Sequence, residues 1–554
     1  MTQRAITLSD PSRWTFVGGE WRQSDDDVIL PPAESRSYGP QNFQAFYGEL
    51  TAYDLEADYE IRINGMPSFC EPRLIVRAQD PAGYYAVGLP SVGQSWRSKG
   101  IWAAIWRVEA GGMHRLLDFK QVPGVPAEHG RWYRCRLTCT GSTIGLSIDG
   151  RPVVSACDET YGAGRIGLGA WGPAEFRNVR VQGDDEAAPT WQDEARPAVP
   201  WFSPDPLDDD AVEQYCHAVR RLPSRRLLMW LGRGQFRLSA EGKVHAVVRL
   251  VSDDAGRTWG DPKVVSAANT LRGADSLEGA LAYYTLPDSC GGRVRALYQS
   301  SQDARDTFVL DSPDEGVTFG EPKRVTIEGD WPARPDRWLG YSMLVTGGGE
   351  ILRFYYTEPL PHTRQIAEMP AGGGMTWAGV ASQAYVMRST DGGDTWSAPV
   401  NLDGVWWPGV DKPIEPNFDM TEAAACVAPD GSVCCMVRPI SSPVMWQTWS
   451  RDGGQTWEPS AYGPFPGYQL AATQTTGGAM VFCLRFPCIT VYVSHDGGVT
   501  WKGTMIDYAA QGPDPGGMLE VEADIILITY NMVSAPRRVR AQRLRVTPGG
   551  VEPD

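Results

Sequence analysis

Residues 494–501 read SHDGGVTW, and this octapeptide decides the fold because close copies of it recur along the chain. Four earlier copies read SDDAGRTW from Ser252, SPDEGVTF from Ser312, STDGGDTW from Ser389 and SRDGGQTW from Ser450. All share the pattern Ser-x-Asp-x-Gly-x-Thr-aromatic. A motif that recurs at intervals of tens of residues is typical of proteins built from repeated structural units.

Each copy predicts a tight turn of the scaffold and not a catalytic group. An aspartate side chain can accept hydrogen bonds from backbone amides of its own turn, and glycine readily adopts a positive φ. The aromatic residue can fill the space between neighbouring units. We therefore expect a structural role for the five motif aspartates, Asp254, Asp314, Asp391, Asp452 and Asp496.

Length and composition bound the remaining choices. A chain of 554 residues is too long for one hydrophobic core, so two or more domains are expected. With 51 basic and 67 acidic residues the net charge is −16, which argues against nucleic acid or an anionic membrane as a partner. The 61 glycines, set between short alternating segments, favour an all-β protein.

The cysteines and the N-terminus give further expectations. The 11 cysteines include no metal-like CxxC pair, so buried free thiols are expected, with no metal or other cofactor. No apolar run is long enough to span a membrane. The first residues, MTQRAITLSDPSRWTF, contain no apolar signal-peptide region, which predicts a cytoplasmic protein unless a signal peptide has been removed.

Residues 1–185 lack the repeat and show the alternation of half-buried strands. RWYRCRLTC at 131–139 is followed by GLSIDGRPVVSA at 145–156 and GAGRIGLGAW at 162–171. This order resembles the concanavalin-like (laminin-G-like) β-sandwich, or jelly roll, which implies two packed antiparallel sheets. Residues 186–204 are polar and rich in proline, which predicts a linker.

Residues 205–554 form the predicted second domain. Each repeat unit reads as several short strands, and four-stranded units of this size stack radially into a propeller. The motif is identified as the Asp-box (BNR repeat), and the region resembles the sialidase-like superfamily of six-bladed β-propellers. Five boxed units and a closing unit at 518–546 would make the six blades.

The propeller architecture predicts where chemistry would lie, because the innermost strand of each blade starts near a central funnel. Candidate catalytic residues at these positions are His217, Tyr341, Tyr356 and Glu422. Candidate substrate-binding residues are Arg233, Glu278, Arg337, Trp338, Arg438 and Arg485. An insertion at 361–383 could form a pocket wall.

Residues 421–438, TEAAACVAPDGSVCCMVR, resemble a sialidase segment in which a glutamate opens a strand and an arginine closes the hairpin. The resemblance implies that Glu422 polarises a nucleophile and that Arg438 binds a substrate carboxylate. The planar fork of arginine suits a carboxylate because it offers two parallel hydrogen bonds. The alternative interpretation is a surface ion pair of little energetic weight.

Three departures from the sialidase pattern argue against a typical sialidase. Residues 215–218 read Tyr-Cys-His-Ala where sialidases have Arg-Ile-Pro after an aromatic residue. The last blade, GPDPGGMLEVEAD at 512–524, has no tyrosine nucleophile, and GRGQFRLSAEGK at 232–243 has no aspartate acid.

His217 takes the place of a catalytic arginine, and imidazole is a competent general base near neutral pH. The alternative is a buried and inert histidine. Some propeller polysaccharide lyases resemble this arrangement, since they use a first-blade histidine with arginines that neutralise a uronate carboxylate.

These observations predict a carbohydrate-active enzyme that acts on an oligosaccharide or polysaccharide. We expect an exo-acting glycoside hydrolase that cleaves a glycan with an acidic sugar. Such an enzyme needs two carboxyl groups, for which Glu278, Glu358 and Glu422 are candidates. A lyase acting on a uronate linkage with His217 as base and a non-catalytic carbohydrate-binding protein are the alternatives.

Overall fold

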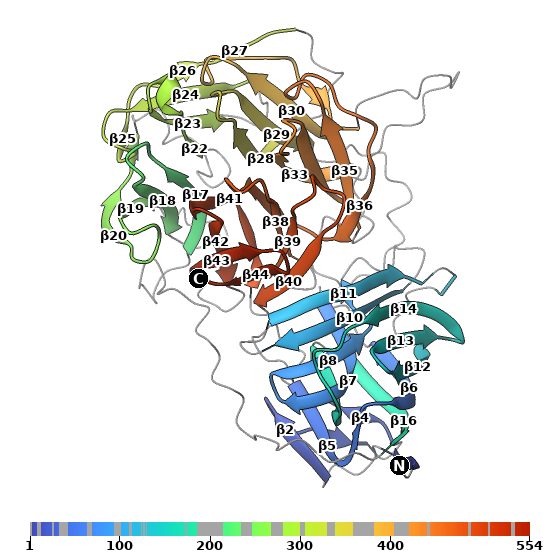
Figure 1. Cartoon of the computed structure of the whole chain (residues 1–554). Coiled ribbons are helices and arrows are strands. Elements are labelled where there is room, and N and C mark those ends of the chain that lie inside the picture. Colours follow the sequence, from blue (N-terminus) through green and yellow to red (C-terminus); the bar gives the residue numbers. More distant parts are fainter. Residues whose placement is uncertain are drawn as a thin grey trace, which may run out of the picture.

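The computed structural model describes most of the chain as β-strands (Figure 1). The described residues are 3–7, 13–24, 27–32, 43–63, 69–92, 101–109, 113–122, 124–125, 128, 130–171, 174–184, 214–233, 246–267, 281–299, 305–329, 338–357, 382–403, 420–439, 444–485, 489–507, 510–532 and 538–554. Apart from 3-10 conformation at Arg13, the helical element within them is the short 3-10 turn η5 (Asp288–Cys290). The predicted all-β class is therefore confirmed. None of these residues belongs to a helix that could cross a membrane.

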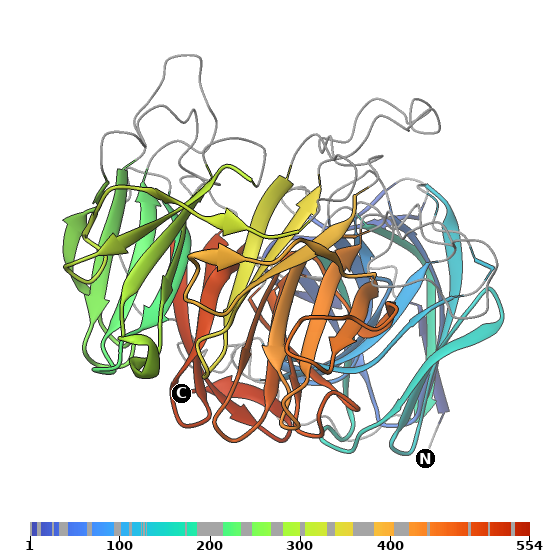
Figure 2. The same ribbon diagram turned by 90° about the horizontal axis from the view of Figure 1, so that it is seen from above.

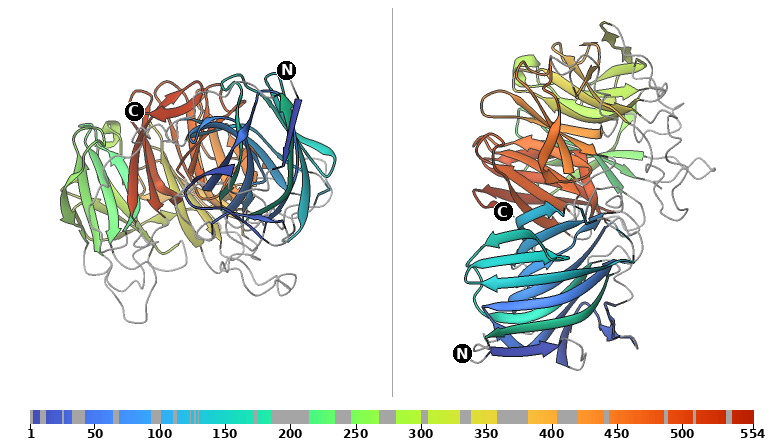
Figure 3. Two further views of the ribbon diagram at one scale, coloured as in Figure 1. Left: turned by 90° about the horizontal axis from the view of Figure 1, so that it is seen from below. Right: turned by 90° about the vertical axis from the view of Figure 1, so that its right-hand side faces the viewer.

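Two antiparallel sheets make up the N-terminal part (Figure 3). The first has the order β14-β13-β12-β6-β16-β4-β3, with β1 beside β16. Its strands are β1 (Gln3–Thr7), β3 (Arg22–Gln23), β4 (Ile29–Leu30), β6 (Leu55–Ile63), β12 (Trp132–Thr140), β13 (Thr143–Ile148), β14 (Arg151–Cys157) and β16 (Ala174–Asp184).

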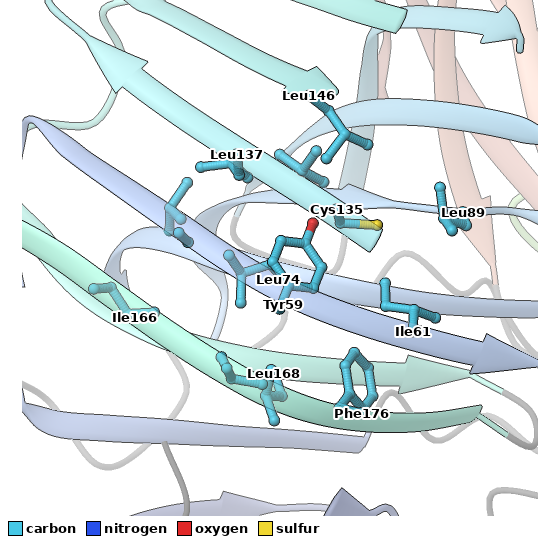
Figure 4. Packing of buried hydrophobic residues seen from close by; sticks show 14 of the residues in the cluster. Tyr59, Ile61, Leu74, Leu89, Cys135, Leu137, Leu146, Ile166, Leu168 and Phe176 are labelled. Carbon is cyan, nitrogen blue, oxygen red and sulfur yellow. The ribbon is translucent and has the colours of Figure 1, made fainter. Parts of the chain in front are cut away.

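The second sheet begins with the order β2-β5-β15-β7-β8-β10-β11, and β9 pairs with β7. These strands are β2 (Trp14–Val17), β5 (Phe43–Ala52), β7 (Phe69–Asp80), β8 (Gly83–Gly88), β9 (Ser91–Val92), β10 (Trp102–Glu109), β11 (Met113–Gln121) and β15 (Gly164–Trp171). Alternate side chains of β6, including Tyr59 and Ile61, pack with Leu74 of β7 in one core (Figure 4). Cys135 and Cys139 belong to this core as buried free thiols, as predicted.

Five separate four-stranded antiparallel sheets follow in a propeller-like arrangement. In Figure 1 the first strand of each sheet lies toward the middle of the ring and the fourth toward its rim. The sheets are β17 (Gln214–Arg221), β18 (Leu227–Arg233), β19 (Ala246–Ser252) and β20 (Gly260–Val264); β22 (Leu281–Thr285), β23 (Val294–Gln299), β24 (Thr307–Ser312) and β26 (Lys323–Arg324); β28 (Trp338–Val345), β29 (Ile351–Thr357), β30 (Ala384–Ser389) and β32 (Val400–Asn401); β33 (Met420–Val427), β34 (Val433–Pro439), β35 (Val444–Ser450) and β36 (Ala461–Pro466); and β41 (Ala510–Glu522), β42 (Ile525–Met532), β43 (Val539–Thr547) and β44 (Gly550–Pro553).

Four further strands, β37 (Leu470–Gln474), β38 (Met480–Arg485), β39 (Ile489–Ser494) and β40 (Lys502–Asp507), pair in the same antiparallel way. They do not form a separate sheet, because β40 also pairs with β11 through His114–Met505 and Arg115–Thr504. One 12-stranded sheet thus runs from the N-terminal part into the ring. Figure 2 shows the N-terminal sheets packed against one flank of the ring.

The repeated motif forms the turns that its sequence predicts. In each copy the serine hydroxyl donates to the aspartate, and the aspartate accepts from the backbone amide of the threonine. The motif glycine has a positive φ in every copy: Gly256, Gly316, Gly393, Gly454 and Gly498. The structural role of the five aspartates is confirmed.

Two short parallel bridges link neighbouring sheets of the ring. β21 (Ser266–Ala267) pairs with β25 (Thr318–Phe319), and β27 (Thr326–Ile327) pairs with β31 (Thr395–Trp396). Trp396 of the third motif copy is buried in the cluster between the second and third of these sheets. The motif aromatics therefore join adjacent sheets, as expected.

Candidate functional site

Four first strands of the ring are irregular near their beginnings. Pairing shifts register between Cys216 and Ala218 in β17, Gly340 and Met343 in β28, Met420 and Ala423 in β33, and Pro513 and Met518 in β41. Such bulges re-aim side chains and are frequent next to active sites. Three of the four predicted catalytic residues, His217, Tyr341 and Glu422, lie in these irregular segments.

Glu422 and Arg438 form an ion pair inside the ring. The Arg438 Nη1 atom lies 2.7 Å from each carboxylate oxygen of Glu422, and both side chains are 14% exposed. Burial alone disfavours the charged guanidinium, but the Glu422 carboxylate outweighs it and raises the pKa of Arg438. The alternative interpretation as a surface pair is therefore wrong, since the pair is largely removed from water.

Tyrosines frame this ion pair. The Cζ atom of Arg438 lies 5.3 Å from the ring centroid of Tyr468, within cation–π range. The rings of Tyr341 and Tyr356 are 6.4 Å apart in an edge-to-face contact. Tyr341 also contributes to the raised pKa of the Arg438 guanidinium. The predicted residues Tyr341, Tyr356, Glu422 and Arg438 thus form one cluster.

The Tyr341 hydroxyl ties β28 to β37. It accepts from the Leu470 amide at 2.8 Å and donates to the Leu470 carbonyl at 3.2 Å. In chain order the sheet that begins with β33 lies between β28 and β37. The Tyr341 side chain therefore links two sheets that are not consecutive in the chain. The Tyr341 hydroxyl therefore bonds to both backbone polar groups of Leu470.

His217 lies in the bulge of β17, half-buried against an aromatic pair. Its ring is 6.2 Å from that of Tyr283, which stacks on Trp230 at 4.7 Å. Burial lowers the pKa of His217 to about 4. The imidazole is therefore neutral at pH 7, able to accept a proton but weakly basic.

Arg485 lies at the end of β38 and is 7% exposed, and its amide donates to the Tyr468 carbonyl at 2.8 Å. Arg233 ends β18 and Trp338 begins β28, but their side chains are outside the described part of the structure. Four other predicted features also lie outside the described residues: Glu278, Arg337, Glu358 and, but for its last two residues, the insertion 361–383.

Two buried polar groupings were not predicted. Tyr530 donates to Asp507 Oδ2 at 2.8 Å, and Arg540 approaches the same oxygen at 3.1 Å. Arg353 on β29 is 7% exposed, and its Cζ atom lies 5.6 Å from the ring centroid of Tyr355. A lone arginine within the apolar run ILRFYY was the available sequence signal for Arg353. The described residues include no group of His, Cys, Asp and Glu that could hold a metal ion.

Comparison with known families matches two segments. Residues 7–182 match a 3-keto-alpha-glucoside-1,2-lyase-like domain, and residues 492–502 match the BNR/Asp-box repeat. The repeats are Asp-boxes. The predicted Asp-box repeats and propeller-like arrangement are accordingly confirmed, and the first family match lies within residues 1–185. No curated protein matches the chain.

Several solved structures resemble the chain at low identity. A Hadza microbial sialidase shares 13% identity over 93% of this chain and 98% of its own, with a TM-score of 0.44. A protein of unknown function from Dyadobacter fermentans shares 16% over 62% and 97%, with a TM-score of 0.43. An α-L-arabinofuranosidase from Fusarium graminearum shares 14% over 62% and 96%, with a TM-score of 0.39. At these TM-scores the likenesses say nothing about the reaction.

Proposed function

We propose that the chain is a carbohydrate-active enzyme, an exo-acting glycoside hydrolase that cleaves a glycan bearing an acidic sugar. In this proposal β37–β40 is the sixth blade of the Asp-box propeller, and the two N-terminal sheets are a β-sandwich formed by residues 1–185. The observation that supports it is the buried Glu422–Arg438 ion pair at a bulge inside the ring. The two predicted tyrosines, Tyr341 and Tyr356, lie beside it.

The ion pair suggests a division of roles. Glu422 accepts hydrogen bonds from Arg438 at both carboxylate oxygens, and we assign it charge stabilisation or the activation of a nucleophile. A hydrolase of this kind needs a second carboxyl group as the acid. Glu278 and Glu358 remain the candidates from the sequence.

A lyase is the second candidate; the lyase-like family match covers residues 7–182 and does not include His217. In this reaction neutral His217 would take the C5 proton of a uronate. The electron pair of that C–H bond would form the C4–C5 double bond, and the C4 oxygen would leave with the departing glycan. Burial lowers the pKa of His217 to about 4, which makes it a weaker base for that step than an ordinary imidazole.

The test compares Glu422→Gln with Glu458→Gln on a panel of neutral and uronate-containing oligosaccharides. Glu458 is a matched control because it pairs with Arg451 at 2.9 Å in the connection between β35 and β36, but is about half exposed. We expect the natural chain to release reducing sugar. Glu422→Gln should lower kcat/KM by about 100-fold or more, the scale of losing one catalytic group, with no change in the control.

Three results would contradict the hydrolase. An unsaturated, ultraviolet-absorbing product would show a lyase, and loss of that product in His217→Ala would place the base. Glycan binding without any turnover would show a carbohydrate-binding protein. Full activity in Glu422→Gln would remove this residue from the mechanism.

A further inference from the structure

We propose that Tyr468 is a positioning residue of the candidate site and that the N-terminal sheets hold it in place. Tyr468 lies in the connection between β36 and β37, beside the Glu422–Arg438 ion pair. On this proposal the N-terminal sheets complete the site of the ring and are not only an attached module. Its consequence for catalysis rests on the proposed function, whereas the arrangement of the residues does not.

The side chain of Tyr468 belongs to the core of the N-terminal sheet, although its backbone is part of the ring. Tyr468 and Met505 of β40 are buried in a cluster, here called the Tyr468 cluster, whose other buried members lie on β5, β7, β8 and β10: Phe46, Ile75, Ala78, Tyr84, Ala86, Ala104, Trp106 and Val108. Leu470, two residues farther on, belongs instead to a cluster of ring residues. The tyrosine side chain is therefore packed by the N-terminal sheet.

The backbone next to this side chain is held by the ring. The Arg485 amide donates to the Tyr468 carbonyl at 2.8 Å, and the Tyr341 hydroxyl bonds to both backbone groups of Leu470. Gln469, between them, has a φ of 43°, a left-handed conformation that non-glycine residues seldom adopt and that persists only where the surroundings fix it. This conformation lets Tyr468 and Leu470 enter different clusters.

The aromatic ring of Tyr468 also contacts the candidate site. The Cζ atom of Arg438 lies 5.3 Å from its centroid, and the same guanidinium donates to Glu422 at 2.7 Å. A cation–π contact removed from water is attractive and depends on where the ring face lies. The Tyr468 ring thus connects the Glu422–Arg438 pair to the N-terminal sheet.

Strand β11 seats the N-terminal sheet against the ring at this place. Leu116 of β11 is partly buried and packs against both the Tyr468 cluster and the ring cluster that contains Leu470. On the same strand His114 pairs with Met505, which is itself a member of the Tyr468 cluster. A shift of this interface would therefore move the Tyr468 ring and, through it, Arg438.

Two neighbouring residues of β7 separate positioning from ordinary packing. Ile75 and Leu74 are both buried and face opposite sides of the sheet. Ile75 belongs to the Tyr468 cluster, whereas Leu74 belongs to the core between the two N-terminal sheets (Figure 4). Truncating either residue leaves a cavity beside the same strand, but only Ile75→Ala should disturb Tyr468.

The experiment compares Tyr468→Leu, Tyr468→Phe, Ile75→Ala and Leu74→Ala in the full-length chain. The first measurement is the NMR signal of the Arg438 Nε–H group, assigned by its loss in Arg438→Lys. The second is KM and kcat on the oligosaccharide that the natural chain cleaves. The NMR signal needs no substrate, so it tests the arrangement independently of the proposed function.

We expect the Arg438 signal to shift in Tyr468→Leu, because the ring current of the tyrosine is lost, and KM to rise about 10-fold, the scale of a desolvated cation–π contact. Tyr468→Phe keeps the ring face and should recover most of that loss. Ile75→Ala should shift the signal and raise KM by a smaller factor, and Leu74→Ala should do neither. A simple loss of folded protein would lower kcat and leave KM unchanged.

An Arg438 signal that stays in place in Tyr468→Leu, or that moves equally in Ile75→Ala and Leu74→Ala, would overturn the proposal. So would a Tyr468→Phe variant as impaired as Tyr468→Leu. If Tyr468→Leu or Ile75→Ala does not fold, Ile75→Val against Leu74→Ala provides the same comparison.

The two proposals fail in different ways. The expected shifts in a chain that cleaves no glycan would support the positioning of Arg438 and remove the hydrolase. Turnover with a natural KM in Tyr468→Leu would keep the hydrolase and overturn the role of Tyr468.

Discussion

At the scale of single residues, the motif aspartates are occupied by their own turns. Asp496 accepts from the Ser494 hydroxyl at 2.8 Å, from the Thr500 amide at 2.9 Å and from the Thr500 hydroxyl at 2.6 Å. These bonds favour the ionised form and lower the pKa of Asp496 to about 2. The other four motif aspartates also have lowered pKa values, so hydrogen bonds within the turn favour the ionised aspartate in every repeat.

This shift predicts acid sensitivity. An unfolded aspartate titrates near pH 3.9, so the contribution of Asp496 to stability is complete above that value and is lost as the pH falls toward about 2. Urea midpoints measured from pH 5 to pH 2 should fall steeply for the natural chain and less steeply for Asp496→Asn. Asp253→Asn, at an exposed carboxylate of the first repeat, should retain the steep fall. Identical curves for all three proteins would contradict this interpretation.

At the scale of elements, bulges in the first strands set the geometry of the candidate site. A regular strand places neighbouring side chains on opposite faces, whereas a bulge inserts a residue and re-aims it. His217, Tyr341 and Glu422 share this placement on three different strands. The candidate site is therefore built from bulges on three different strands and does not come from one sequence motif.

Gly516 tests the contact between two of these bulges. Gly516→Ala would place a Cβ atom 2.7 Å from the His217 carbonyl oxygen, closer than van der Waals contact allows. We expect a loss of about 1–3 kcal/mol in the free energy of unfolding, measured with urea, together with reduced activity. Gly347→Ala is the control, because nothing lies within 4 Å of its added Cβ atom. Equal stability of the two variants would show that the bulges do not depend on this contact.

At the scale of the whole molecule, the N-terminal sheets and the ring are joined by one continuous sheet. β11 pairs with β40, and Arg115 supports the junction. Its Nη1 atom donates to the Gly549 carbonyl at 2.8 Å and to the Thr504 hydroxyl at 3.3 Å. Figures 1 and 3 show this junction between the N-terminal sheets and the ring. The two parts are expected to unfold together.

Arg115→Ala should uncouple the two parts. Losing hydrogen bonds made by a buried charged group costs about 1–3 kcal/mol, so calorimetry should show a single transition dividing into two. Arg136→Ala, which removes an exposed pairing with Glu56, should leave one transition. Two separate transitions already present in the natural chain would show that the shared sheet does not couple them.

The sequence alone determined the motif turns, the all-β class and the positions of His217, Tyr341 and Glu422 on first strands of the ring. This was possible because the hydrogen bonds of an Asp-box join residues within one stretch of eight. The turn can therefore be predicted from the local sequence. The Glu422–Arg438 pair was also accessible, since both residues belong to one hairpin. Whether that pair is exposed or buried could not be read from the sequence, because burial depends on the surrounding sheets.

Only the tertiary structure decided which distant groups meet. The link from Tyr341 to Leu470 depends on closure of the ring by strands far apart in sequence. The joining of β11 to β40 likewise connects segments separated by most of the chain. Local propensities carry no information about such contacts, because bulges and ring closure follow from how whole sheets pack.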